Sequence, residues 1–301
     1  MMKPSLWLSS GLLCCTFLTG CIGSTVIRHN YQDYSQTLHY NAQQQMLQNL
    51  VRLKYRETPF FLKVGALSVN YELQVRGLLG VEDLHDANSP IGIEAEPTVL
   101  EKPTVTYTPV EGNAFVKQML AEIDPNVFAL LVRANWPIKT LCLMLVENVS
   151  DADGKRLDAA GFNTLLTALD AAQKTHDLQL QREKDQPITL VTPTVSVPLS
   201  RFRFRSFLDV MYELSKNITV PAGQQTWVRP TRDSNGLMQV QSSWLAPHNE
   251  YVSVKHNGYY FSIAQNDVVS KDAFALLQVL YQMQAGDIQS VQPVLTLPVG
   301  N

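Results

Sequence analysis

The sequence predicts a mixed α+β protein, and three patterns support that prediction. Apolar residues recur every three or four positions from Tyr34 to Leu53, which is typical of a helix with one apolar face. Apolar and polar residues then alternate from Leu67 to Arg76, the period of a strand with one buried face. Asn257-Gly258 separates two short β-like runs and favours a tight hairpin turn. We therefore expect a helix-rich N-terminal part and a C-terminal part of antiparallel strands packed by helices.

The first residues have the organisation of a targeting segment. A basic start at Lys3 precedes an apolar run from Leu6 to Leu18, and small residues lead up to Cys21. A run of this length is too short to remain as a membrane-spanning helix, and it matches the apolar part of a secretory signal. We expect a signal peptide at residues 1–20 and a lipidated polar tether at residues 21–32.

The end of this segment, Leu18-Thr19-Gly20-Cys21, resembles a bacterial lipobox. The resemblance implies cleavage before Cys21 and acylation of its sulfur and of the new amino group, so that more than one acyl chain holds the protein to a membrane. The alternative is an ordinary signal peptide with a cysteine near its cut site. The residue after Cys21 is Ile22. An aspartate at this position resembles an inner-membrane retention signal, so its absence favours an outer-membrane, periplasm-facing location.

Composition restricts the function classes. Of the 301 residues, 45% are hydrophobic and 17% are charged, which fits a folded domain. Loss of Lys3 with the signal changes the formal charge from −3 to −4, which argues against nucleic-acid binding. Cys142 is the only cysteine after Cys21, so an internal disulfide is not expected. Its apolar neighbours favour a buried packing residue over a reactive nucleophile.

The first region, residues 33–186, is predicted to contain most of the helices. We expect a helix that starts at the N-cap Asp33 and stops at Thr58-Pro59, and then the strand around Leu67 to Arg76. Residues 82–103 are acidic and rich in proline, which indicates a long surface loop. A short strand at 104–108 and helices at about 111–122, 126–135, 137–148 and 158–184 complete the region.

The second region, residues 187–301, is predicted to hold antiparallel strands and two helices. The expected order is an edge strand or connector at 188–197, a helix at 206–216, strands at 225–230 and 237–244, the hairpin at 251–264, a helix at 270–285 capped by Ser270, and a last strand at 294–299.

Three arginines form the best candidate binding site. Arg201, Arg203 and Arg205 alternate with Phe202 and Phe204, so in a strand the guanidinium groups share one face. Guanidinium binds phosphate or carboxylate through two parallel hydrogen bonds, which suits an anionic lipid, a glycan or an acidic protein. The alternative is a half-buried strand whose arginines form structural ion pairs.

The sequence contains none of the common catalytic motifs. There is no Gly-x-Ser-x-Gly, phosphate-binding loop, dinucleotide fingerprint or His-Glu-x-x-His, and the six histidines lack metal-ligand spacing. The turn Asp151-Ala152-Asp153-Gly154 lacks the spacing of a calcium loop. We expect a non-enzymatic protein with no metal and no cofactor; a hydrolase with a dispersed active site is the remaining enzymatic alternative.

Four segments resemble uncharacterised envelope lipoproteins of Gram-negative bacteria: Asn49-Leu50-Val51-Arg52-Leu53-Lys54-Tyr55, Thr104-Val105-Thr106-Tyr107-Thr108-Pro109, Gly258-Tyr259-Tyr260-Phe261 and the ending Pro293 to Gly300. The resemblance implies a shared fold and outer-membrane placement, and it assigns no residue a role. We expect a membrane-anchored protein that docks envelope proteins or helps to assemble a larger complex. The alternative is an envelope lipoprotein that binds lipid or glycan.

Overall fold

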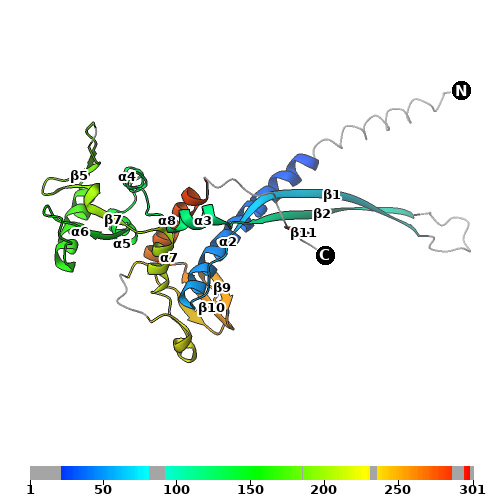
Figure 1. The fold of residues 1–301 in the computed structure, drawn as a ribbon. Coiled ribbons are helices and arrows are strands. Elements are labelled where there is room, and N and C mark those ends of the chain that lie inside the picture. The colour runs from blue at the N-terminus through cyan, green and yellow to red at the C-terminus, as the bar shows by residue number, and fades with distance from the viewer. Residues whose placement is uncertain (1–21, 81–91, 185, 231–235, 287–294, 299–301) are drawn as a thin grey trace, which may run out of the picture. The chain divides into compact units, whose positions relative to one another are not determined.

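The computed structural model describes residues 22–80, 92–184, 186–230, 236–286 and 295–298. Helices and antiparallel sheets occur together, so the predicted mixed α+β class is confirmed (Figure 1). The signal peptide at 1–20 and the lipidation residue Cys21 lie outside the described residues. No helix in the described ranges is both long and apolar enough to cross a membrane.

The described residues group into two compact units, each discontinuous in sequence. One comprises residues 22–56 with 214–278, and the other comprises 57–213 with 279–298. This division differs from the expected boundary between residues 186 and 187. The expected boundary followed the order of elements along the chain, whereas the observed units pair the first helix with strands near the C-terminus.

The first unit is built on helix α2 (Ile22–Lys54). The predicted helix is present, but it begins at Ile22 instead of after the expected N-cap Asp33. Its apolar stripe is buried at Met46, Leu47, Leu50 and Val51. The polar face also contributes contacts, because the side-chain amide of Gln43 donates a 2.6 Å hydrogen bond to the Tyr251 hydroxyl.

A three-stranded antiparallel sheet completes the first unit, in the order β8 (Gln241–Ser243), β10 (Tyr259–Ala264) and β9 (Glu250–His256). The predicted hairpin turn is confirmed: Asn257 and Gly258 have φ angles of 46° and 85°, which a tight turn requires. The expected strand at 225–230 is wrong, because the 3-10 helix η2 (Ala222–Trp227) begins after Pro221.

Two further helices, α7 (Phe207–Ser215) and α8 (Val268–Gly286), agree with the predicted helices. The inner face of α8 is buried at Phe274, Leu277 and Leu280. Its N-terminal cap differs from the expectation. Asp267 accepts a 3.0 Å hydrogen bond from the backbone N–H of Ser270, while the Ser270 hydroxyl accepts one of 2.8 Å from the backbone of Gln239.

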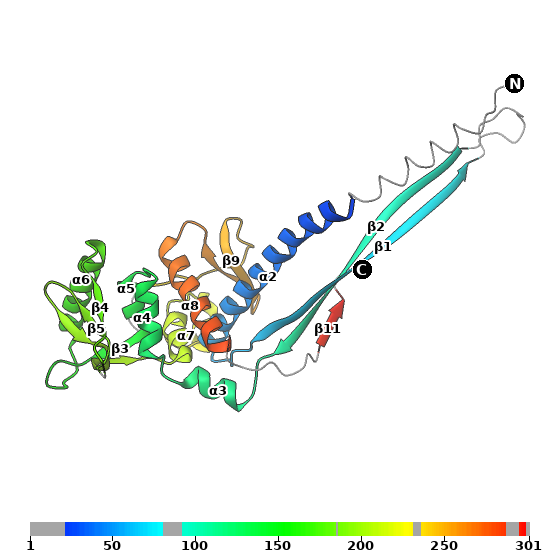
Figure 2. The same ribbon diagram turned by 90° about the horizontal axis from the view of Figure 1, so that it is seen from above.

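The second unit contains a long two-stranded ribbon of β1 (Leu62–Gly80) and β2 (Gly92–Pro109). The strands run side by side over their full length in both views (Figure 1, Figure 2). Strand β11 (Leu295–Pro298), predicted from the sequence, pairs with β2 between Thr104 and Tyr107. The expected loop at 82–103 is therefore wrong from Gly92 onward.

Aromatic packing fixes the base of the ribbon. The Phe61 ring stacks on Tyr281 with a centroid separation of 4.8 Å and meets Phe115 edge-on at 5.7 Å. The Phe61 carbonyl accepts a 2.9 Å hydrogen bond from the backbone of Val110, just beyond the end of β2. Burial raises the pKa of the Tyr281 hydroxyl to about 12. The base of the ribbon is therefore packed against aromatic side chains and shielded from water.

The rest of the second unit consists of short elements: α3 (Asn113–Leu120), α4 (Pro125–Arg133), α5 (Ile138–Leu145), β3 (Val146–Val149), α6 (Ala159–Lys174), β4 (Gln179–Gln181), β5 (Thr189–Val191), β6 (Ser196–Pro198), η1 (Leu199–Arg201) and β7 (Phe202–Phe204). The predicted proline starts are present at α4 and α5. Helix α6 ends ten residues before the expected 184, because His176 adopts a φ of 61° and the chain turns into β4.

Candidate functional site

The arginine segment adopts a strand only over Phe202–Phe204, where β7 pairs with β3. Phe202 and Phe204 are both buried and their ring centroids lie 6.1 and 5.3 Å from that of Phe128 on α4. The two phenylalanines thus face the core of the second unit. Arg201 lies in the preceding 3-10 helix, so the three arginines do not all lie on one strand.

Arg205 holds together the end of helix α5. Its guanidinium donates hydrogen bonds to the carbonyl oxygens of Leu143, Met144 and Val146 at 3.0, 3.0 and 2.6 Å. The last carbonyls of a helix have no partner inside the helix, so a cation at this position both satisfies them and complements the helix dipole. Desolvation lowers the pKa of the Arg205 guanidinium, and the nearby carboxylates of Glu213, Glu147 and Asp209 oppose that shift.

Arg203 has a different environment. Its guanidinium pairs with the Glu147 carboxylate at 3.0 Å, and both side chains are largely exposed. An exposed pair of this kind contributes little to stability. The structure therefore gives Arg205 a packing role, gives Arg203 a surface ion pair, and does not assemble the three predicted cations into one anion-binding face.

We expect Arg205→Gln to lower the free energy of unfolding by about 2–3 kcal/mol, because it leaves carbonyls at the end of α5 without their charged donor. Arg203→Gln is the matched control and should change it by about 0–1 kcal/mol. Chemical denaturation followed by circular dichroism measures both. Equal effects of the two substitutions would contradict the assignment of Arg205 to the helix end.

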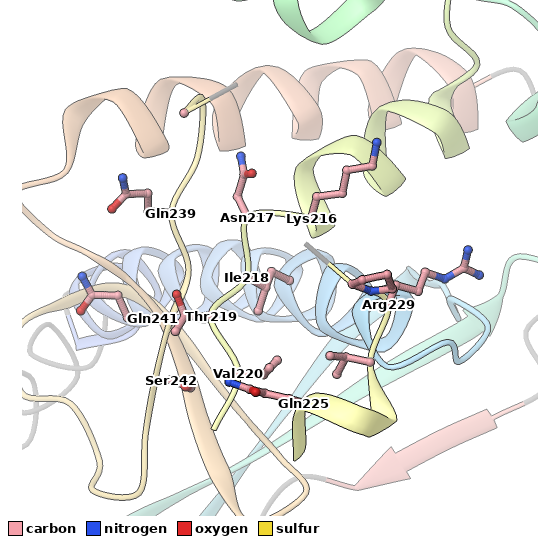
Figure 3. A pocket seen from close by; sticks show the side chains of 13 residues that line it. Lys216, Asn217, Ile218, Thr219, Val220, Gln225, Arg229, Gln239, Gln241 and Ser242 are labelled. Carbon is pink, nitrogen blue, oxygen red and sulfur yellow. The ribbon is translucent and has the colours of Figure 1, made fainter. Parts of the chain in front are cut away.

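The first unit contains a polar cleft with a volume of about 890 Å³. Three segments line it: one follows α7, one follows η2, and one leads into β8 (Figure 3). The lining residues are Lys216, Asn217, Ile218, Thr219, Val220, Gln225, Val228, Arg229, Pro230, Gly236, Gln239, Gln241 and Ser242. Sequence reasoning did not find this site, because its polar residues come from separate segments without a motif spacing.

The buried side chain of Lys54 fixes the walls of the polar cleft. Its ammonium group donates a 3.0 Å hydrogen bond to the carbonyl of Lys216, and its own carbonyl accepts one of 3.0 Å from the backbone of Arg229. Burial lowers the pKa of the Lys54 ammonium group. The end of α2 thereby positions the backbones of both cationic residues that line the cleft.

The chemistry of the cleft favours a polar, negatively charged ligand. Among the described lining residues, the ionisable ones are both cations, Lys216 and Arg229, and none is a carboxylate. Side-chain amides and hydroxyls supply most of the remaining polar surface, and these groups both donate and accept hydrogen bonds. Such a lining matches the hydroxyl groups and acidic substituents of a sugar better than an apolar acyl chain.

The other reactive side chains have packing environments. Cys142 is buried, as predicted, and desolvation raises the pKa of its thiol to about 12, which disfavours the nucleophilic thiolate. Within the described ranges, no group of three or more His, Cys, Asp or Glu side chains could hold a metal ion. A second cavity of about 660 Å³ along α6 is lined mainly by alanine and threonine, and Asp177 is its one ionisable residue.

The two long edges of the ribbon form the second candidate site. Strand β1 is the terminal strand of its sheet, so its outer edge pairs with no described strand. The described side chains from Lys63 to Ser68 are exposed, including Val64 and Leu67. Exposed strand edges of this length are sites of pairing with other chains, and proteins normally protect them.

Comparison with known proteins adds no assignment. No protein-family model, curated protein or solved structure matches this chain. The proposed function therefore rests on the polar cleft and the ribbon.

Proposed function

We propose that this protein is a non-catalytic, lipid-anchored component of the bacterial outer membrane that docks envelope proteins and helps to assemble a complex. The observation that carries the proposal is the ribbon. Among the described residues of the β1–β2 ladder, only the four positions of β2 from Thr104 to Tyr107 pair with a third strand. An isolated two-stranded ribbon is only marginally stable, because its own strand pairing contributes little free energy. A partner that pairs with it explains most of its length better.

The described polar face of the ribbon is consistent with contact in water. The carboxylate of Glu72 pairs with the Lys102 ammonium group at 2.5 Å and accepts a 3.2 Å hydrogen bond from Gln74. The hydrogen bond from Lys102 is the main cause that lowers the pKa of Glu72. These residues are solvated in the free chain, so their charges are available to a partner that supplies complementary polar groups.

The anchor is the part of the proposal that comes from sequence alone. The Cys21→Ser variant should lose acylation and move from the membrane fraction to the soluble fraction, because the acyl chains supply the membrane affinity. Fractionation with metabolic acyl labelling measures this. Unchanged labelling and membrane recovery would refute the lipobox assignment.

Shortening the ribbon tests docking. Replacing residues 71–101 by Asn-Gly joins Asn70 to Lys102, which face each other in the observed register, through a dipeptide that favours a tight turn. The shortened chain should keep its fold and its membrane fractionation, and it should lose most of its crosslinked envelope partners. Circular dichroism and crosslinking with mass spectrometry check the two parts.

Two results would count against the docking role. Recovery of the full set of partners by the shortened chain would show that the ribbon is dispensable for docking. Lys63→Gln, which removes one exposed charge near the base and keeps the ribbon intact, serves as the surface control and should recover the same partners as the unmodified chain.

A second candidate function is binding of an acidic glycan, and the polar cleft favours it. We expect Lys216→Gln with Arg229→Gln to weaken binding of acidic oligosaccharides by about tenfold or more, a loss of at least about 1.4 kcal/mol. Isothermal titration against neutral and acidic oligosaccharides measures this, and salt should weaken the unmodified interaction.

The matched control for the cleft is Lys255→Gln with Lys271→Gln. These two cations belong to the same unit and lie over the rings of Tyr260 and Tyr251 instead of in the cleft. If both double variants lose binding equally, the effect comes from net charge and the cleft is not a glycan site.

A further inference from the structure

We propose that the outer edge of β1 pairs with the β1 edge of a second copy of this chain, antiparallel and around a two-fold axis at Gln74. The pairing would join two ribbons into one four-stranded sheet in the order β2, β1, β1, β2. It deepens the docking function proposed above by naming the partner, and it rests on that function for its purpose.

The prolines of β2 show which way the backbone groups of the ribbon point. In an antiparallel pair, successive residues direct their N–H and C=O alternately toward the partner strand and away from it. Pro97 lies opposite Val75 and Pro103 lies opposite Val69, six residues apart with no register shift between them. Proline has no N–H, so both positions fit the ladder only if they face away from β1.

A third proline supports this assignment. If Val105 and Tyr107 also face away from β1, they form the hydrogen-bonded pairs with β11, opposite Leu297 and Leu295. Pro298 then lies opposite Thr104, at a position where β11 needs no N–H for the ladder. Pro97, Pro103 and Pro298 are therefore accommodated by the same alternation.

The alternation makes the two edges of the ribbon unequal. The outer edge of β2 is covered by β11 at its base and lacks the donors of Pro97 and Pro103 beyond it. Proline at such positions is a known protection against strand addition. Strand β1 has 19 residues and no proline, so the outward N–H groups of its edge are all present. Pairing between the β1 edge of one copy and the β2 edge of the next is thus disfavoured, which leaves β1 with β1.

The charge pattern of β1 selects one register. With Gln74 opposite Gln74, Glu72 of each copy lies opposite Arg76 of the other. The same register sets Leu73 opposite Val75 and Val69 opposite Leu79. An axis at residue 72 would place Glu72 opposite Glu72, and an axis at 76 would place Arg76 opposite Arg76. An axis at 73 or 75 would place neither residue opposite one of unlike charge.

The register also fits the length of the ribbon. It overlaps the two strands from Ser68 to Gly80, about 40 Å, and provides about a dozen new backbone hydrogen bonds. The base from Leu62 to Leu67 stays outside the overlap, so the packed residues around Phe61 are not displaced. Strand β1 can therefore pair without unfolding any described element.

A cysteine at the axis tests the pairing. In the full-length chain, purified in detergent, Gln74→Cys should form an intermolecular disulfide under mild oxidation, because directly opposite residues in antiparallel strands bring their Cβ atoms within bonding range. Lys63→Cys, exposed on the same strand and outside the overlap, is the matched control and should stay monomeric. Cys142 is buried and does not compete, and the proposed processing removes Cys14 and Cys15 and acylates Cys21. Absence of the Gln74→Cys disulfide, or equal crosslinking at Lys63→Cys, overturns the proposal.

A proline substitution gives an independent measurement. Val75→Pro reproduces on β1 the residue that faces it on β2, so it removes one outward donor and no donor of the ribbon's own ladder. Sedimentation velocity should show a dimer for the unmodified chain and for Val75→Ala, and a monomer for Val75→Pro. An unmodified monomer, or a Val75→Pro dimer, overturns the proposal.

The two proposals can fail separately. Loss of partners on shortening the ribbon, without any Gln74→Cys dimer, keeps the docking function and removes self-pairing. If the Gln74→Cys variant dimerises and the separate, shortened chain retains all envelope partners, self-pairing stands and the docking role of the ribbon falls.

Discussion

The orientation of backbone amides in one long antiparallel ladder is the constraint on which the second unit depends. A strand satisfies half of its hydrogen-bonding groups through one neighbour and must present the other half to water or to another strand. In the ribbon of β1 and β2, this accounts for the spacing of Pro97 and Pro103 and for the place where β11 adds. The outward backbone groups of β1 are the ones that pair with no described strand.

Local patterns predicted the elements that have one dominant signal. The hairpin at Asn257-Gly258 and the apolar stripe of α2 both depend on neighbours close in sequence, and both are present. The strand predicted from Leu67 to Arg76 is correct but short, because the register shift between Val64 and Ala66 interrupts the alternation on one side. Beyond Arg76, Leu78 and Leu79 are consecutive apolar residues and hide the same period.

Predictions from the sequence were wrong where two structural signals competed. Prolines and acidic residues in 92–103 favour a loop locally, but in a two-stranded ribbon every second N–H is not needed by the partner, and proline is tolerated there. The same limit applies to the sites. Alternation separated Phe202 and Phe204, which are buried, from the arginines. It could not show that carbonyls at the end of α5 bind Arg205, because that contact joins segments about sixty residues apart. The walls of the polar cleft depend on Lys54, which bonds to Lys216 at a separation of 162 positions.

The discontinuous first unit has a consequence for how the chain acquires its structure. Gln43 on α2 bonds to Tyr251, and 208 positions separate them, so the partner strands of α2 are synthesised long after the helix itself. Contacts of such separation close slowly, and the apolar stripe of α2 has no native cover in the interval. The newly made N-terminal segment therefore exposes an apolar surface, one that a chaperone can bind, until the last hairpin has been synthesised.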